Sequence, residues 1–460
     1  MSKRCTALVL AITLLGSGAW ADRLPIDEMP NFRLNDHTGT SHELYHYGDA
    51  EAVVIYLHGN GCPIVRQSVP YLKNLRDSYT ERGVVFLMLN ANAQDARDEI
   101  AEEAADFEID LPILHDAAQM TAFTMGVKRT ATVLVADPQE DFELIYFGAM
   151  DDRFDYGSNV EPKNHYLRDA LDAHLAGEPI DPARTEVKGC LISYMHEDQA
   201  AISYEDDVVP VLANRCMPCH VDGSIGPFSL ESYADVRGWS AMIQETIMTR
   251  RMPPWHADPH YSAFESALGM TTEEERTILA WIEDGARRDD RSAPDPLVAH
   301  AERLRARVGE RAWTLGEPDV TMQLPEPQVL PATGVFDYKY IEVDPGLTED
   351  AWVRAVEVKP TNLQVVHHAL VFMRYPKSHR HLRYDPRGGL SGYFAAYLPG
   401  SPPPAYPEQT GQFVPAGATF VFQMHYNATG REEVDQTEMG LYFYDEPPAK
   451  ELRIRAASNR

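Results

Sequence analysis

The sequence Cys216-Met217-Pro218-Cys219-His220 constrains this chain more than any other stretch. Two thiols three positions apart, followed at once by an imidazole, can attach a haem through two thioether bonds while the histidine binds its iron. The competing interpretations are a dithiol redox pair and half of a zinc site. A zinc site normally uses a second Cys/His pair, and no cysteine follows Cys219. The motif therefore predicts a covalent haem c held by Cys216, Cys219 and His220.

The sequence after this motif offers the rest of a haem site. A metal-bound histidine needs a partner that fixes its ring tautomer, and Pro227 stands where cytochrome c domains use a proline carbonyl. We predict Met252 as the sixth iron ligand, because Pro253 and Pro254 stiffen its backbone. Other candidates for this ligand are Met242, Met248, Met270, His256 and His260. The order of helix, motif, loop and helix resembles a monohaem cytochrome c domain, which implies an all-α domain at residues 186–290.

The start of the chain and its charge indicate a compartment and exclude some partners. A basic start, a short apolar run and the letters AWA are typical of a secretory signal, predicted at residues 1–21. No later run approaches the roughly twenty apolar residues of a membrane span, so we expect no span after signal cleavage. The protein is then periplasmic or otherwise exported. The net charge of −29 makes nucleic acid and anionic membranes poor partners.

Length and cysteine count bound the domain organisation and the thiol chemistry. The 460 residues allow about three domains. Of the five cysteines, Cys5 leaves with the signal and two bind haem, so Cys62 and Cys190 remain. In an oxidising compartment these two can pair as a disulfide or serve separately, and their spacing does not decide between the alternatives.

Residues 22–185 alternate between strand and helix patterns. The apolar run at 51–57 predicts a buried strand, and residues 64–81 predict a helix after a short turn. This order places Cys62 at a helix N-terminus, where the helix dipole favours the thiolate and lowers the pKa of the thiol. Further elements are expected at 83–89, 95–107, 132–135 and 142–147. The alternation resembles the thioredoxin-like redoxin family, which implies an α/β domain.

The departures from that family concern the thiol chemistry. Thioredoxins carry a second cysteine three residues after the first, where this chain has Val65, and peroxiredoxins carry a threonine three residues before the reactive cysteine, where it has Gly59. The proline that usually faces the thiol is replaced by Ala131. Cys62 is therefore either a one-cysteine redox site or a remnant on a docking scaffold. Arg129 is either a partner of its thiolate or a surface charge.

Composition changes in the last third of the chain. Residues 291–316 are charged and contain prolines, which predicts a linker with a short helix. From 317 to 460 short apolar runs alternate with Pro/Gly turns, a pattern typical of an antiparallel sandwich or jelly roll. Its strands are expected at 338–343, 352–358, 364–373, 419–426 and 439–444.

Three histidines in this β region are candidate metal ligands. His367 and His368 are adjacent in one predicted strand, and His425 lies in another. Neighbours in a regular strand face opposite sides, so His367 and His368 can share a metal only where the strand bends or bulges. The alternative is one core histidine and one surface histidine.

The residues around these histidines resemble the first copper domain of the type II ascorbate-dependent copper monooxygenases, such as peptidylglycine α-hydroxylating monooxygenase and dopamine β-monooxygenase. The shared features are the His-His pair before apolar residues and a Gln-x-His-Tyr sequence at 423–426 after a Pro-x-Gly turn. The resemblance implies an electron-transfer copper at His367, His368 and His425, and imidazole suits copper. In those enzymes a second copper domain hydroxylates the substrate. We expect that domain either beyond Arg460 or in a partner chain, and the alternative is that this protein has lost it.

Together these features predict an exported redox protein in which haem c passes electrons to copper. Tethering the two centres raises their effective concentration. Such a protein is a copper-dependent monooxygenase, or the electron-delivering part of one, that acts on a small unidentified substrate and takes electrons from a periplasmic donor. The alternatives are a non-catalytic electron-transfer or copper-handling protein, and a thiol oxidoreductase centred on Cys62.

Overall fold

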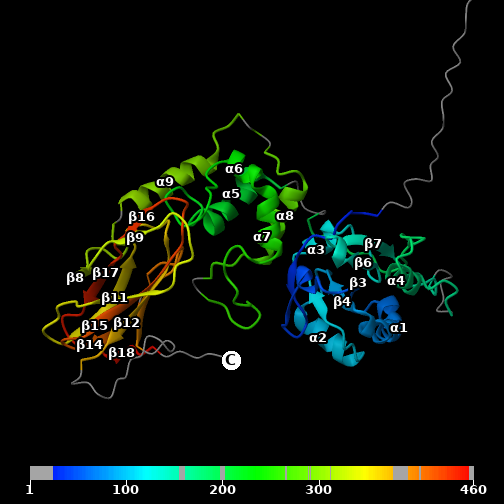
Figure 1. The fold of residues 1–460 in the computed structure, drawn as a ribbon, viewed down its shortest axis with the longest axis horizontal. Helices are drawn as coiled ribbons and strands as arrows, with labels where there is room; N and C mark the ends of the chain where they lie inside the picture. Colours follow the sequence, from blue (N-terminus) through cyan, green and yellow to red (C-terminus); the bar gives the residue numbers. More distant parts are fainter. Residues whose placement is uncertain are drawn as a thin grey trace, which may run out of the picture. The chain divides into compact units, whose positions relative to one another are not determined.

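The computed structural model describes residues 24–154, 161–196, 202–264, 267–288, 290, 292–310, 312–376, 392–403 and 406–454. The predicted signal at residues 1–21 lies outside this part. Contacts divide the chain into two units (Figure 1). Unit 1 consists of Met1–Ile202, Ala241–Pro254 and Met270–Ala286, and unit 2 consists of Ser203–Ser240, Trp255–Gly269 and Arg287–Arg460. None of the described helices combines the length and the apolar character needed to cross a membrane.

Unit 1 contains a five-stranded sheet with the order β5-β4-β3-β6-β7. Strands β3, β4 and β5 run parallel, and β6 and β7 continue the sheet in antiparallel pairs. The strands are β3 Ala52–His58, β4 Val84–Asn90, β5 Ile113–His115, β6 Val133–Asp137 and β7 Glu143–Gly148. Every residue of β3 is buried, as expected for a central strand covered on both faces. This is the α/β architecture that the sequence predicts.

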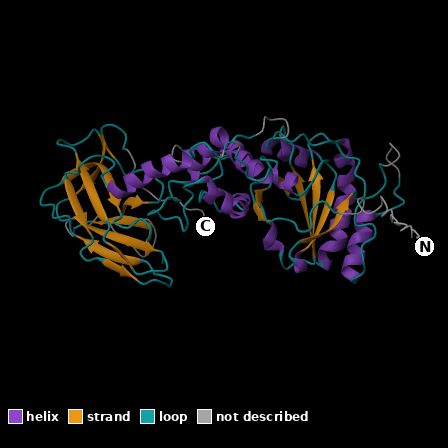
Figure 2. Cartoon of the chain, turned by 90° about the horizontal axis from the view of Figure 1, so that it is seen from above, coloured by secondary structure: helices purple, strands orange, loops and turns teal. Residues whose placement is uncertain are grey.

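Helices surround this sheet (Figure 2). They are α1 Pro63–Tyr79, α2 Arg97–Asp106, α3 Met120–Thr124 and α4 Tyr166–Ala176. Shorter elements are β1 Arg33–Asn35, β2 Ser41–Glu43, η1 Leu44–Tyr47, η2 Thr80–Arg82 and η3 Pro138–Glu140. Two later helices, α7 Ser240–Met248 and α8 Thr272–Glu283, group almost entirely with unit 1. The Arg276 side chain of α8 donates to the carbonyls of Ala117 and Ala118.

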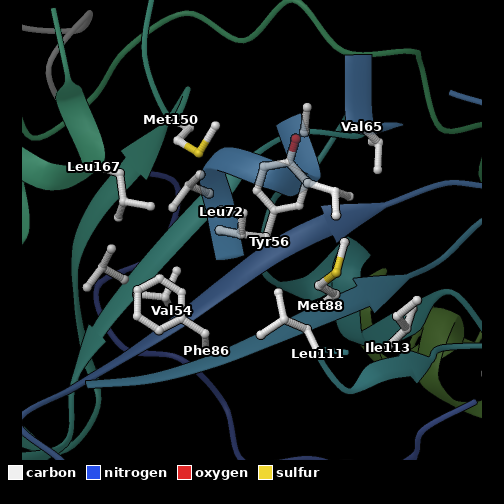
Figure 3. Close-up of a cluster of buried hydrophobic side chains, with 14 of the residues drawn as sticks. Val54, Tyr56, Val65, Leu72, Phe86, Met88, Leu111, Ile113, Met150 and Leu167 are labelled. Atoms are coloured by element: carbon white, nitrogen blue, oxygen red, sulfur yellow. The ribbon is translucent and has the colours of Figure 1, made fainter. Parts of the chain in front are cut away.

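One apolar cluster holds α1 against the sheet (Figure 3). Val54 and Tyr56 of β3 share a face because residues two apart in a strand point the same way. Val65 and Leu72 of α1 belong to the same cluster, and residues seven apart in a helix share a face. This packing fixes the start of α1, and with it Cys62, at the carboxyl end of β3.

Residues 185–195, called here the return segment, lie along unit 1 after α4. The backbone N–H of Ile192 donates to the Lys128 carbonyl over 3.0 Å, and the Tyr194 hydroxyl donates to the Val127 carbonyl over 2.8 Å. The sequence assigns residues 186–195 to the haem domain, whereas these contacts place them on unit 1. The apolar side chains of Ile192 and Tyr194 are buried there, which explains why the segment does not leave with the following domain.

Unit 2 begins with the helical run that approaches the haem motif. Its segments are η4 Tyr204–Val208, α5 Val209–Val211 and η5 Leu212–Cys216. The described part of this unit also contains the helices α6 Tyr233–Gly238 and α9 Pro296–Glu310. Helix α9 occupies most of the predicted linker at 291–316.

The rest of unit 2 is β-rich (Figure 2). One sheet has the order β10-β15-β12-β13, a second has the order β18-β14-β11-β17-β8, and β16 pairs with β9. The strands are β8 Val320–Gln323, β9 Gln328–Leu330, β10 Lys339–Val343, β11 Ala351–Lys359, β12 Val366–Arg374, β13 Tyr393–Tyr397, β14 Thr410–Val414, β15 Thr419–Tyr426, β16 Glu433–Asp435, β17 Glu438–Phe443 and β18 Lys450–Glu451. Side chains from both larger sheets, such as Phe422 and Leu441, share one core.

Candidate functional site

The three histidines of the β region converge at one point of unit 2. His368 of β12 lies opposite His425 of β15, and the register of this pair shifts between Val366 and His368. The shift is the irregularity that lets adjacent residues face one side, and Nδ1 of His367 lies 3.0 Å from Nδ1 of His368. One ligand nitrogen from each histidine lies within 4.8 Å of the others. Within the described ranges no other group of three or more His, Cys, Asp or Glu is arranged to hold a metal.

The surroundings of His368 and His425 favour the neutral form of these two imidazoles. Burial, followed by the neighbouring His425 and His367, lowers the pKa of His368 to about 4. Burial, followed by His367, also lowers the pKa of His425. Nδ1 of His425 is buried without a hydrogen-bond partner, although buried polar atoms normally have one. Neutral imidazoles with a free lone pair are the donors that copper takes, so the residues fit this ion.

The haem motif follows directly on the helical run that ends at Cys216. The backbone N–H of His220 donates to the Cys216 carbonyl over 3.0 Å, which brings the histidine back over the first cysteine. Nδ1 of His220 donates to the carbonyl of Phe228 over 3.0 Å. The hydrogen bond fixes the tautomer and leaves Nε2 available to iron, as metal-bound histidines require. The residues therefore fit a covalent haem.

The sequence predicts the carbonyl of Pro227 in this role, and the structure instead uses the next residue, Phe228. The reason is a tight turn, in which the N–H of Gly226 donates to the Cys219 carbonyl over 2.7 Å. A side-chain carbon at Gly226 would lie 2.5 Å from that same oxygen and 2.8 Å from Nδ1 of His220. Because of this turn, the first carbonyl that faces the His220 ring is that of Phe228.

Met252, the predicted sixth ligand, has a side chain that is 42% exposed. It belongs to the stretch 241–254 of unit 1, whereas His220 belongs to unit 2. The pairing of these two residues on one iron stays a prediction. The alternative ligands divide in the same way, with Met242, Met248 and Met270 in unit 1 and His256 and His260 in unit 2.

The two remaining cysteines meet in unit 1. Sγ of Cys62 lies 3.2 Å from Sγ of Cys190, and both are free thiols in this structure. The Thr130 hydroxyl lies 3.2 Å from Sγ of Cys62 and accepts the backbone N–H of Cys190 over 2.9 Å. The sequence leaves open whether the two cysteines pair, and the structure brings their sulfurs into contact.

The same geometry explains two departures from the redoxin pattern. A side-chain carbon at Gly59 would lie 2.5 Å from Nδ2 of Asn92 and 2.7 Å from a methyl carbon of Thr130. A threonine three residues before Cys62 would have to displace the side chains of Asn92 and Thr130, and here Thr130 supplies a hydroxyl to the sulfur from another loop. Ala131, at the place of the usual proline, adopts a φ of 59° and donates its N–H to the Leu57 carbonyl over 2.7 Å.

The hydrogen bonds of this pair separate the two pKa values. Burial opposes ionisation of Cys62, but the Thr130 hydroxyl and the amide of Val65, in the first turn of α1, outweigh it and hold the pKa of this thiol below its usual value. The hydrogen bond to Cys62, followed by burial, raises the pKa of the Cys190 thiol. Of the two thiols, Cys62 is therefore the one that ionises first.

Arg129 has a structural role beside this pair. Its guanidinium donates to the Gly189 carbonyl over 2.8 Å and so anchors the return segment. Thr130 is the functional residue that the sequence does not reveal, because its only signal is its place before Ala131. The cysteine count, by contrast, already leaves Cys190 as the one available partner of Cys62.

Comparison with known proteins supports the assignment of the first unit. Residues 25–149 match the Redoxin family, so the chain contains a thioredoxin-like domain. A search of curated proteins finds no significant match. Similar solved structures include an uncharacterized conserved protein from Geobacillus kaustophilus, with 26% identity, a TM-score of 0.34 and coverage of 37% of this chain and 93% of that one.

Two further similar structures are those of named redox proteins. Peroxidoxin BcpB from Mycobacterium tuberculosis has 21% identity and a TM-score of 0.25, with coverage of 33% of this chain and 92% of the other. The thioredoxin domain of thiol-disulfide oxidoreductase BVU-2223 from Bacteroides vulgatus has 13% identity and a TM-score of 0.24, with coverage of 26% and 85%. The assignment of the domain rests on the Redoxin match and on the order of the sheet.

Proposed function

We propose that this redoxin-containing chain is an exported haem- and copper-binding redox protein, in which a c-type haem delivers electrons to a copper ion for copper-dependent monooxygenation. The single observation that carries the proposal is the convergence of His367, His368 and His425, whose ligand nitrogens lie within 4.8 Å of one another. In this reading the helices around the haem motif are a cytochrome c domain, and the β region is a jelly roll.

The haem motif supports the other end of the proposed electron path. Cys216 and Cys219 would form the thioethers, and His220 would bind iron through Nε2 because Nδ1 is engaged by the Phe228 carbonyl. A haem held in this way supplies one-electron chemistry. The residues of the chain would hold the haem in place and keep His220 in one tautomer.

The two proposed centres are joined by a short stretch of unit 2. A side-chain carbon at Gly400 would lie 3.4 Å from Sγ of Cys219, so the turn after β13 lies against the haem motif. Tyr397, the last residue of β13, pairs with Ala369 of β12, which is the residue after His368. Three residue steps and one step between strands separate Gly400 from the strand that carries His367 and His368, a distance of at most about 15 Å.

The proposal is tested by metal content. The full chain is produced in a host that matures c-type cytochromes, and iron and copper are counted per chain. We expect about one of each in the wild type. In His367→Ala and His425→Ala we expect copper to fall at least tenfold with iron unchanged, because two imidazoles bind copper much more weakly than three.

His46→Ala is the matched control, since His46 is an exposed histidine of unit 1 and its loss should leave both metals unchanged. Copper that persists in both His367→Ala and His425→Ala removes the proposed ligand set. Oxygen uptake by the loaded protein with ascorbate and candidate substrates then separates monooxygenation from electron transfer alone.

A further inference from the structure

Backbone contacts, rather than its own side chain, hold Cys190 in front of Cys62. Thr130 and Cys190 exchange two hydrogen bonds, from the Thr130 N–H to the Cys190 carbonyl over 2.9 Å and from the Cys190 N–H to the Thr130 hydroxyl over 2.9 Å. Ile192, two residues on, donates to Lys128. The return segment therefore runs beside residues 128–130 as a short added strand, and the sulfur of Cys190 has a defined position.

Gly189 permits this close approach. A side-chain carbon at this position would lie 1.6 Å from the Thr130 carbonyl oxygen and 2.5 Å from its carbonyl carbon. Both are backbone atoms, which cannot turn away as a flexible side chain can. Only glycine lets the return segment pass at this distance, immediately before Cys190.

The two sulfurs differ in access. Cys62 is only 4% exposed, because it lies between the start of α1, Thr130 and the return segment. Cys190 is exposed. A reagent that approaches from solvent therefore reaches the sulfur of Cys190 first.

The two sulfurs also differ as leaving groups. In thiol–disulfide exchange the thiol with the lower pKa leaves faster. The Thr130 hydroxyl and the amide of Val65 favour the thiolate of Cys62 despite its burial, whereas the pKa of Cys190 is raised by its hydrogen bond to Cys62. Attack on Cys190 would release the Cys62 thiolate, which the Thr130 hydroxyl and the amide of Val65 still stabilise in the mixed disulfide.

We propose that Cys62 and Cys190 form a reversible disulfide that exchanges electrons with an outside dithiol through Cys190. The site is distinct from the haem and copper residues and does not depend on either metal. It differs from a one-cysteine site centred on Cys62, since the outside partner never bonds to Cys62.

The exchange has two balanced steps. An outside thiolate attacks Sγ of Cys190, a new S–S bond forms to Cys190, the bond between Cys62 and Cys190 breaks, and Cys62 leaves as a thiolate. The second thiol of the same dithiol, once deprotonated, attacks its own sulfur in the mixed disulfide and releases Cys190, which takes up a proton. The dithiol loses two electrons, and the disulfide of the chain gains them.

The reverse reaction provides the test, with oxidised glutathione as the probe and the full haem-loaded chain as the protein. Cys62→Ser and Cys190→Ser are compared, and peptide mass spectrometry locates and times the glutathione adducts. We expect Cys190 in Cys62→Ser to react at least about ten times faster than Cys62 in Cys190→Ser. In the reduced wild type we expect a peptide that links Cys62 to Cys190, with release of two molecules of reduced glutathione.

Two results overturn the proposal. One is a Cys62 that reacts in Cys190→Ser as fast as Cys190 does in Cys62→Ser, and the other is a wild type that yields no linked peptide. If circular dichroism shows that a serine variant is unfolded, the oxidised wild type is treated with reduced glutathione instead, and the mixed disulfide is trapped by acid. A glutathione adduct on Cys190 supports the proposal, and an adduct on Cys62 counts as the first of the two overturning results.

Gly189→Ala tests whether the return segment positions Cys190. Because its new carbon meets the Thr130 carbonyl, we expect the linked peptide to form at least about tenfold more slowly with oxidised glutathione. Gly238→Ala is the matched control, since a carbon added there meets no atom within 4 Å outside its own helix and its chain neighbours, and this variant should link at the wild-type rate. Equal rates in the two variants would show that the close approach at Gly189 is not needed.

Discussion

The chain holds two pairs of thiols that meet in opposite ways. Cys216 and Cys219 are three residues apart and are brought together by one turn after a helix, with the N–H of Cys219 donating to the Cys216 carbonyl over 3.2 Å. Cys62 and Cys190 are 128 residues apart and meet only because the return segment packs beside residues 128–130. A local pair keeps its spacing in any fold, whereas the distant pair exists only when unit 1 is folded.

The difference suits the two kinds of chemistry. Covalent attachment of a cofactor through two thiols requires a fixed spacing between them, and a local pair provides that spacing whether or not the rest of the chain has folded. A reversible disulfide gains from thiols that the fold itself aligns, because the folded environment can set their pKa values apart. Variants and reagents that act on one thiol pair and spare the other test this difference.

The largest expected effect is the loss of haem. In the double variant Cys216→Ser/Cys219→Ser we expect no covalent haem, because no thioether can form. Haem staining after denaturing electrophoresis measures it. The double variant Cys62→Ser/Cys190→Ser is the matched control and should stain like the wild type. Equal staining of the two double variants would mean that the local pair does not carry the haem.

The next effect concerns stability. A disulfide between Cys62 and Cys190 closes a long loop and should stabilise unit 1 by about 2–4 kcal/mol, chiefly by restricting the unfolded chain. We expect a phosphine reductant to lower the melting temperature of unit 1 on the order of 10 °C in scanning calorimetry. Cys62→Ser/Cys190→Ser should melt at one temperature with and without reductant. A wild type insensitive to the reductant would contradict the proposed bond.

The smallest effect is a shift in titration. Thr130→Val removes the hydroxyl that stabilises the Cys62 thiolate, so we expect the pKa of that thiol to rise. Ultraviolet absorbance of the thiolate in the reduced, haem-loaded protein follows the titration. Since the wild-type pKa of Cys62 is held below its usual value, the thiolate persists to lower pH there and is lost earlier, on acidification, in the variant.

Thr132→Val serves as the control for this titration. Its hydroxyl donates to the Arg129 carbonyl over 2.7 Å instead of reaching a sulfur, so the titration of Cys62 should not move. An equal shift in both threonine variants would assign the change to the loop rather than to the hydroxyl.

Most of the regular structure could be predicted from local pattern. The strands around β3, β4, β6 and β7 follow from continuous apolar runs, and β10, β11, β12, β15 and β17 follow from short apolar runs between turns. The strands that the sequence does not reveal, such as β14, are short or contain polar residues, as in the sequence TGQFV. Their position is set by pairing with neighbouring strands, which local composition does not encode.

The candidate sites also differ in how far local sequence predicts them. The cysteines and histidine of the haem motif are adjacent in sequence, so their proximity follows without a fold. The convergence of His425 with His367 and His368 depends on the register of β12 against β15 and on a bulge, and only a family resemblance indicated it. Thr130 depends on a tertiary contact with Cys62, and no local signal marks it.

The turn at Gly400 has a consequence for how the protein matures. Under the proposed haem chemistry, the sulfur of Cys219 must be reached by whatever joins it to a vinyl group, yet the turn lies against that sulfur once unit 2 has folded. Synthesis makes the motif well before residue 400, and early segments fold first. Haem attachment should therefore be complete before the last strands assemble. A polypeptide that assembles these strands first would fold without haem and could no longer take it up.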